Sequence, residues 1–213
     1  MIVNKSHARA LVKANLRKLE ELRKACDVIP ATGKASHWLK AHIKIYDSYF
    51  GGDNLLQHTE VHHPRTKKLQ KISRHYLWFK DDGSADIALL VLNPRKCEFY
   101  IDILPLHISQ HALMRITADQ LNMKDAVNLL GRNAELLFDN YVWPVGKEIC
   151  VYDDEGMYAL VKDKDEETGI ETIVVKTFIR GDKLDMGSEH EKIYSELKDG
   201  EFIIHPTLEE KEA

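Results

Sequence analysis

The stretch RHYLWFKDDGSADIALLVLNPRKCEFYIDILPLHI, residues 74–108, decides the fold class of this chain. It contains three runs rich in β-branched, aromatic and other apolar residues, at 74–80, 86–92 and 97–108. Asp81–Ser84 separates the first two runs and Asn93–Lys96 the last two, and both segments have the composition of turns. Three strands joined by short turns predict an antiparallel meander, with a bend in the third strand at Pro105.

Helical patterns precede this stretch. Between residues 5 and 26 apolar residues recur at intervals of three and four with charges between them, which predicts one long helix capped by Ser6. The same periodicity predicts a second helix over 35–49 that ends before Gly51. Residues 53–72 are polar and rich in His and Lys, so we expect a loop there with at most one helical turn.

Helices and then strands follow residue 108. A helix is predicted over 109–116 with Ser109 as its N-cap, and a second helix over 123–132 with Asn122 as its N-cap. Three β-rich runs come next, at 149–153, 157–162 and 170–179. A short helix near 188–198 precedes an acidic tail. Strands that cluster in the sequence, apart from the helices, predict an α+β fold: N-terminal helices, then a mainly antiparallel β-sheet with short helices.

Charge divides the chain into two unequal parts. Residues 1–80 contain 16 Lys and Arg against 6 Asp and Glu, a balance of +10, whereas residues 81–213 contain 14 against 28, a balance of −14. We therefore predict a basic helical N-terminal region over 1–72, suited to contact with a polyanion, and an α+β domain over 73–213. The alternative is that the two parts dock on each other and neutralise their charges.

The composition is that of an ordinary globular protein, with 213 residues of which 44% are hydrophobic and 30% charged. No run approaches the roughly 18 apolar residues of a membrane helix, and the N-terminus lacks the apolar core of a signal peptide. The three cysteines are far apart, which excludes a four-cysteine zinc site and a disulfide framework. We therefore expect a cytoplasmic protein that makes no contact with membranes.

His111 and Arg115 carry the clearest chemical signal. A spacing of four puts both on one face of the predicted helix, where the imidazole can transfer a proton and the guanidinium can stabilise charge on phosphorus. Lys176 and Arg180 have an even spacing on the last predicted strand, so we expect them to project from one face of it. The alternative is a structural histidine beside an exposed arginine.

The segment SQHALMRI, residues 109–116, resembles the S-x-H-A-x-x-R helix start of small proteins of the barnase–EndoU–colicin–RelE superfamily, which includes BrnT-like toxins. The order of predicted elements over 105–183 is similar to theirs, and the run VVKTFIR resembles their basic last strand. The resemblance implies a RelE-like domain that cleaves RNA through its 2′-hydroxyl without a metal, or a degenerate relative. The residues that it assigns to the site are His111, Arg115, Lys176, Thr177 and Arg180.

A run of cations precedes the first predicted strand. Clustered Lys and Arg bind phosphate without reading a base sequence. The aromatic residues that follow them, within 76–79, are expected mostly to face the core, because they lie on an apolar strand. The predicted nucleic-acid contacts are Arg65, Lys67, Lys68, Lys71 and Arg74. The alternative is a solvated loop.

Histidines in the same segment offer a weaker metal hypothesis. His58 and His62 would present two imidazoles to Zn²⁺ from a helix, with His63 beside them, and His107 and His111 have the same spacing. Pro64 argues against such a helix, and no third ligand follows at motif spacing. No glycine-rich phosphate loop is present either. We therefore predict neither a metal nor a cofactor.

Together these observations predict an RNA-directed protein of a bacterial or phage toxin-type system. It would be a metal-independent ribonuclease or a degenerate nuclease-like protein that binds RNA. The expected partners are RNA and a protein partner or antitoxin, and the oligomeric state stays open. The alternative is a non-enzymatic protein that uses the same scaffold for protein interaction or as a nucleic-acid mimic. The family pattern has a further Arg soon after the first, and its absence after Arg115 favours this alternative.

Overall fold

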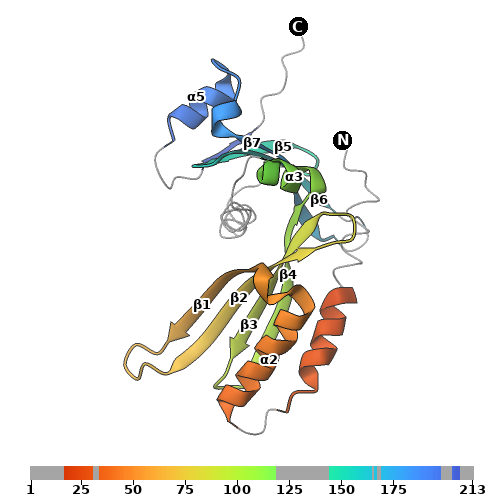
Figure 1. The fold of residues 1–213 in the computed structure, drawn as a ribbon, viewed down its shortest axis with the longest axis vertical. Helices are drawn as coiled ribbons and strands as arrows, with labels where there is room; N and C mark the ends of the chain where they lie inside the picture. Colours follow the sequence, from red (N-terminus) through yellow and green to blue (C-terminus); the bar gives the residue numbers. More distant parts are fainter. Residues whose placement is uncertain are drawn as a thin grey trace.

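The computed structural model of the chain describes residues 17–30, 34–118, 144–164, 166, 169–197 and 203–206. These residues form an α+β protein built on one sheet that extends through an elongated molecule (Figure 1). The strands are β1 (Leu55–His62), β2 (Leu69–Phe79), β3 (Ala85–Asn93), β4 (Glu98–Ile108), β5 (Glu148–Asp153), β6 (Gly156–Lys164), β7 (Glu171–Arg180) and β8 (Ile203–Pro206). Their order in the sheet is β1-β2-β3-β4-β7-β6-β5-β8. Every neighbouring pair except β4 and β7 is antiparallel, so the predicted fold class is confirmed.

Two helices cover one face of β1–β4. They are the helix over 17–27 and α2 (Ala35–Phe50), which lie on the same side of β1–β4 (Figure 1). α2 buries one residue in every four: Trp38, His42, Tyr46 and Phe50. This spacing forms a single stripe along the helix, which packs against β2–β4. Gly51 follows α2 with a φ of 82°, a left-handed conformation that favours glycine.

The core beneath these helices is apolar and largely aromatic. Leu22, Tyr46 and Leu90 come from the first helix, α2 and β3, and all three are fully buried. The hydroxyl of Tyr46 donates a hydrogen bond to the carbonyl oxygen of Leu89 at 3.0 Å, so its burial leaves no unpaired donor. Because full burial of a Leu side chain stabilises by about 1.5–3 kcal/mol, a core of this kind holds both helices on the sheet.

β4 connects the two parts of the sheet. The first part is β1–β4, and the second is β5–β8, which β4 joins through β7. Its pairing with β3 shifts register around Pro105, since Ala88 pairs with Ile103 but Asp86 pairs with His107. Proline has no amide hydrogen for the ladder, and the irregularity removes the need for one. Beyond this point Leu106–Ile108 pair in parallel with β7. The register shift therefore lies where the sequence predicts a bend.

α3 (Gln110–Ala118) covers the second part of the sheet. Ser109 is its N-cap, because the hydroxyl oxygen accepts a hydrogen bond from the amide of Ala112 at 3.2 Å, as predicted. The same hydroxyl donates to the carbonyl oxygen of Lys176 at 2.9 Å, which ties the start of α3 to β7. The remaining helical segments are η1 (Gly52–Asn54), η2 (Gly181–Lys183) and α5 (Glu189–Ser195). α5 lies at the far end of the molecule from α2 (Figure 1).

The polar segment after α2 is a hairpin, and the prediction of a loop over 53–72 is wrong. β1 and β2 pair from Leu55 with Tyr76 to His62 with Leu69. Backbone hydrogen bonds hold β1 against β2, so this edge strand forms although few of its side chains are buried. The division predicted between residues 72 and 73 falls inside β2, whose residues pair with β1 and β3 on both sides of that point.

The other predicted strands are confirmed. Those at 74–80, 86–92 and 97–108 correspond to β2, β3 and β4, and those at 149–153, 157–162 and 170–179 correspond to β5, β6 and β7. The helices predicted over 35–49, over 109–116 and near 188 correspond to α2, α3 and α5. The predicted helix over 123–132 and residues 5–16 lie outside the described residues. None of the described helices is long and apolar enough to cross a membrane.

Candidate nucleic-acid interface

The β1–β2 and β3–β4 hairpins turn at the same end of the sheet. β1 and β3 run toward this end and β2 and β4 run away from it, because successive strands are antiparallel. Ile72 of β2 pairs with Leu92 of β3, so Lys71 lies next to the β3–β4 turn. The turns at 63–68 and 94–97 are therefore spatial neighbours although they are well separated in the sequence.

His63 braces the first turn. Its Nδ1 accepts hydrogen bonds from the amides of Arg65 and Thr66, both at 3.2 Å. Its own amide donates to the carbonyl oxygen of Lys68, and its carbonyl oxygen accepts from the amide of Lys67, both at 2.9 Å. These bonds fix the backbone that carries the cations, which reduces the ordering cost when a ligand binds.

Asn93 braces the second turn in a similar way. Its Oδ1 accepts hydrogen bonds from the amides of Arg95 at 3.2 Å and Lys96 at 3.3 Å, the pattern of an Asx turn. Both cationic side chains are exposed. The Nζ of Lys96 lies 3.9 Å from Oε2 of Glu98, and both side chains are about two thirds exposed, so this ion pair is weak.

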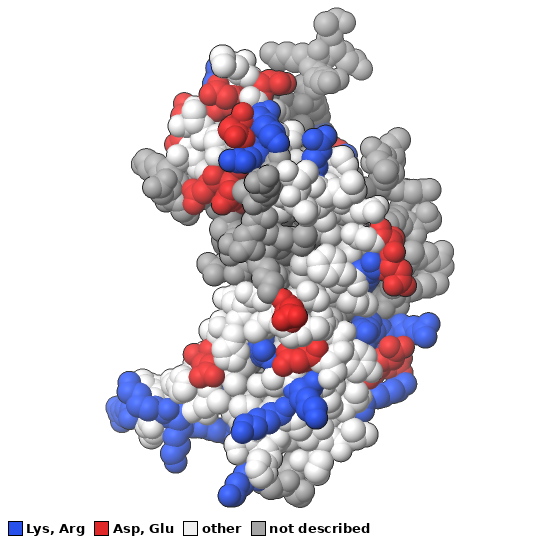
Figure 2. All heavy atoms as spheres, in the orientation of Figure 1, with Lys and Arg blue, Asp and Glu red and all other residues white. Residues whose placement is uncertain are grey.

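Six exposed cations thus lie on or beside two braced turns. We call this set the basic end: Arg65, Lys67, Lys68, Lys71, Arg95 and Lys96. Apart from the contact between Lys96 and Glu98, none of them pairs with a carboxylate of a described residue. The tip of the β1–β2 hairpin is accordingly blue in Figure 2. On the helix over 17–27, by contrast, Arg17 and Lys24 each pair with a glutamate one turn away.

His62 adds charge beside the first turn. Its Nε2 lies 3.0 Å from Oε2 of Glu60, and its Nδ1 lies 3.1 Å from the carbonyl oxygen of Lys67. Both neighbours are acceptors, so only the doubly protonated imidazolium satisfies both contacts. The hydrogen bond with Glu60 raises the pKa of His62. Hydrogen bonds from His58 and His62 in turn lower the pKa of Glu60.

Arg74 does not belong to the basic end. Its side chain is only 11% exposed, and Nη1 donates a hydrogen bond to Oδ1 of Asp47 at 3.1 Å. The hydroxyl of Tyr76 donates to the same oxygen at 2.6 Å. Ile72 and Tyr76 pack under the helices, and alternation along β2 directs Arg74 to that face too. We therefore correct the predicted set of nucleic-acid contacts by removing Arg74.

The histidines of the metal hypothesis do not share a helix. His58 and His62 lie on one face of β1 on either side of Glu60, and His63 is engaged with backbone amides of the turn. His107 lies buried on β4, 2.7 Å from Asp86. Within the described part of the chain, no group of three or more His, Cys, Asp or Glu side chains is arranged to hold a metal ion.

His111 and Arg115 lie together on the exposed face of α3. The buried residues of that helix are Ala112, Leu113 and Ile116. A spacing of four keeps the two polar side chains on the outer side. Neither forms a hydrogen bond or ion pair with a described residue. The geometry is compatible with the predicted division of labour between a proton-transferring imidazole and a fixed cation.

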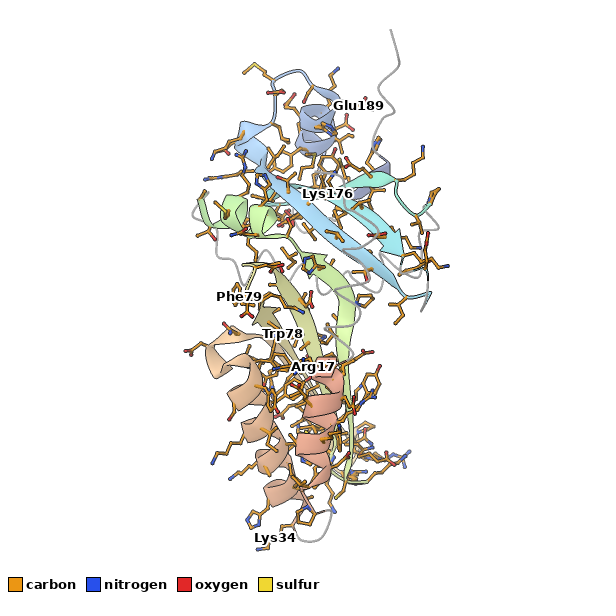
Figure 3. All side chains as sticks on the ribbon, turned by 90° about the vertical axis from the view of Figure 1, so that its right-hand side faces the viewer. Arg17, Lys34, Trp78, Phe79, Lys176 and Glu189 are labelled. Atoms are coloured by element: carbon orange, nitrogen blue, oxygen red, sulfur yellow. The ribbon has the colours of Figure 1, made fainter. Side chains whose placement is uncertain are left out.

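Lys176, labelled in Figure 3, lies on β7. It pairs with Glu148, at the start of β5. Ile149 and Val175, which adjoin these two residues in the chain, both pack in the same cluster as α3. Glu148 alternates with Ile149 along β5 and therefore projects away from that cluster. Its ion pair with Lys176 puts the amino group of Lys176 on the same side. The structure therefore does not bring Lys176 together with His111.

Arg180 lies at the end of β7. Its Nε is 3.3 Å from Oδ1 of Asp182. The pairing of β6 with β7 passes from Val175 to Thr177 and skips Lys176. This irregularity interrupts the alternation, so an even spacing does not by itself put Lys176 and Arg180 on one face. Of the residues predicted for catalysis, α3 brings His111 and Arg115 together, and β7 carries the others separately.

We compared the chain with known proteins. No family model, curated protein or solved structure matches it. The resemblance to the barnase–EndoU–colicin–RelE superfamily and the roles it implies therefore stay predictions.

Arg95 and Lys96 are not among the contacts predicted from the sequence. Residues 93–96 form a turn, as predicted, but the prediction attached no binding role to these cations. The antiparallel order of β1–β4 was the available signal, because it brings alternate turns to one end of a sheet. This signal could be used only if β1 was predicted as a strand, and residues 53–72 were predicted as a loop instead. Lys34, at the start of α2, also lies at the lower end of the molecule (Figure 3).

Proposed function

We propose that the protein binds RNA through the basic end. The observation that carries the proposal is the pair of braced turns, which present six exposed cations at one end of the sheet. Clustered Lys and Arg neutralise backbone phosphates and release the counterions bound there. His62 adds a further positive charge while its imidazole is protonated. This chemistry selects a polyanion by charge and not by base sequence.

A salt titration tests the proposal. We expect the logarithm of the affinity for a labelled RNA oligonucleotide to fall linearly with the logarithm of salt concentration. Each phosphate contact contributes about 0.7 to the slope for a single strand. Lys67→Gln, Lys68→Gln and Lys71→Gln in one variant remove up to three contacts, so the slope should become shallower by about 2.

The matched control removes the same charge elsewhere. Lys147, Lys183 and Lys192 are exposed and belong to the second part of the sheet or the segments beside it. Their replacement by Gln should leave affinity and slope close to those of the wild type. If the variant of the basic end also bound RNA with unchanged affinity and slope, the proposal would fail. That result would favour a non-enzymatic protein-interaction role on the same scaffold.

RNA cleavage is the finer proposal for a toxin-type protein. It is supported by the shared exposed face of His111 and Arg115. Cleavage through the 2′-hydroxyl needs no metal, so a chelator should leave the rate unchanged. His111→Ala should lower the rate by roughly 10²- to 10⁴-fold, as for a lost general acid or base, with RNA affinity nearly intact. Equal cleavage by wild type and His111→Ala would contradict this assignment.

A further inference from the structure

Beside the basic end, the face of β1–β4 opposite the two helices is not covered by any described helix. Ile101 of β4 packs under the helices, so its neighbour Tyr100 projects from the opposite side. The register aligns one residue from each strand in a row across this side: Thr59, Ser73, Val91 and Tyr100. Lys71 precedes Ser73 by two residues, so the row directly adjoins the basic end. No described helix packs over this row.

Tyr100 is the aromatic side chain of the row. It is 49% exposed, which is high for a large side chain on a sheet. Its hydroxyl donates a hydrogen bond to the carboxylate of Asp102, two residues further along the same face of β4. The ring is thereby held along the strand, with Val91 beside it on β3. A flat aromatic surface fixed in this way is suited to stacking.

The charges around Tyr100 and those at the basic end favour different parts of a nucleic acid. Glu98 and Asp102 lie on the same face of β4, on either side of Tyr100, and they repel a phosphate. Most of the cations near this face lie at the basic end, and Lys71 is two strands across and two residues along from Tyr100, about 12 Å away by the usual spacings. The charge of Arg23, on the helix over 17–27, also acts on the hydroxyl of Tyr100. An RNA backbone is therefore favoured at the basic end, whereas an uncharged base is favoured on the ring.

We infer that the ligand is a single-stranded RNA, with its phosphates on the basic end and one of its bases stacked on Tyr100. This inference rests on the proposed RNA binding and adds the strand state of the ligand. In a duplex the bases are paired and stacked on each other, so they cannot reach the ring. Stacking accepts any base, because every base has a flat π-surface.

Fluorescence anisotropy with two probes tests the inference. The probes are a labelled oligouridine of about ten nucleotides and an RNA duplex of the same length. Tyr100→Ala should weaken binding of the oligouridine by roughly 5- to 150-fold, the measured range for loss of one stacked base. It should leave binding of the duplex unchanged, because the duplex uses only the basic end. Tyr100→Phe keeps the ring and should bind the oligouridine nearly as well as the wild type.

A second tyrosine provides the control. Tyr49 is also exposed but lies on α2, on the other side of the sheet, so Tyr49→Ala should bind both probes like the wild type. Equal oligouridine affinity for Tyr100→Ala and wild type would overturn the inference and leave the proposed function standing. Loss of both probes in Tyr100→Ala, with a folded protein by circular dichroism, would also overturn it. A wild type that binds neither probe would refute both proposals.

Discussion

Asp153 allows a pH dependence to be worked out from its surroundings. It is 1% exposed and lies at the end of β5. Its Oδ1 accepts hydrogen bonds from the amides of Glu155 at 2.8 Å and Gly156 at 3.1 Å. Among the described residues, neither its Oδ2 nor the hydroxyl of Tyr158 has a hydrogen bond of good geometry. Burial in these surroundings raises the pKa of Asp153 to about 6.

The raised pKa lowers stability at neutral pH. The ordinary pKa of the group is 3.8, so the folded protein holds the proton more tightly than the unfolded chain does. The free energy of unfolding therefore falls as pH rises from about 4 to about 6, and the loss at pH 7 is about 3 kcal/mol. Asp153→Asn keeps an oxygen for the two amides and cannot ionise. The free energy of unfolding of the variant should exceed that of the wild type by about 1 kcal/mol at pH 4.5 and about 3 kcal/mol at pH 7.

Urea unfolding at the two pH values measures this difference. Asp185→Asn is the matched control, because it removes one exposed carboxylate from the segment that packs beside β5 and β6 and so reports the effect of net charge. A gain for Asp153→Asn that is the same at both pH values would refute the reasoning. So would a loss of stability that grows with pH, because it would mean that the ionised carboxylate is stabilised in the folded protein.

Two other perturbations test parts of the structure separately. The RNA affinity of the wild type should fall as pH rises through the raised pKa of His62, because the imidazole loses its charge. His62→Gln should flatten this profile, and identical profiles in anisotropy titrations would contradict the assignment. Gly181→Ala should destabilise the protein by about 1–3 kcal/mol in urea unfolding, because the added methyl group would overlap the ring of Tyr194. In a protein that already carries Tyr194→Ala, Gly181→Ala should cost less stability than it does in the wild type. An equal cost in the two backgrounds would count against the contact.

Local patterns explain why most of the fold was predictable. The stripe of α2 recurs every four residues, and β3 and β4 combine many β-branched residues with clear turns at their ends. Ser109 was predicted as a cap, and its hydroxyl does accept a hydrogen bond from Ala112. Each of these signals involves residues within one helix, one strand or one turn. Such interactions are encoded over a few residues and need no knowledge of the tertiary structure.

β1 was not predictable in this way. Five of its eight residues, from His58 to His62, are exposed, so it shows no apolar alternation. The strand is held by backbone pairing with β2, which leaves little trace in side-chain pattern. Pro64 argued correctly against a helix, but it occupies a turn between two strands. An edge strand of this kind is defined by its partner and not by its own composition.

Lys71 and Arg74 show that a run of cations in the sequence does not reveal which of them are exposed in the structure. Both belong to the same basic segment of the sequence and to the same strand, β2. They are three residues apart, so alternation sends them to opposite faces of the sheet. Lys71 is exposed beside both turns, whereas Arg74 is buried and bound to Asp47. The sequence predicts where cations are concentrated, but the register of β1–β4 decides which of them a phosphate can reach.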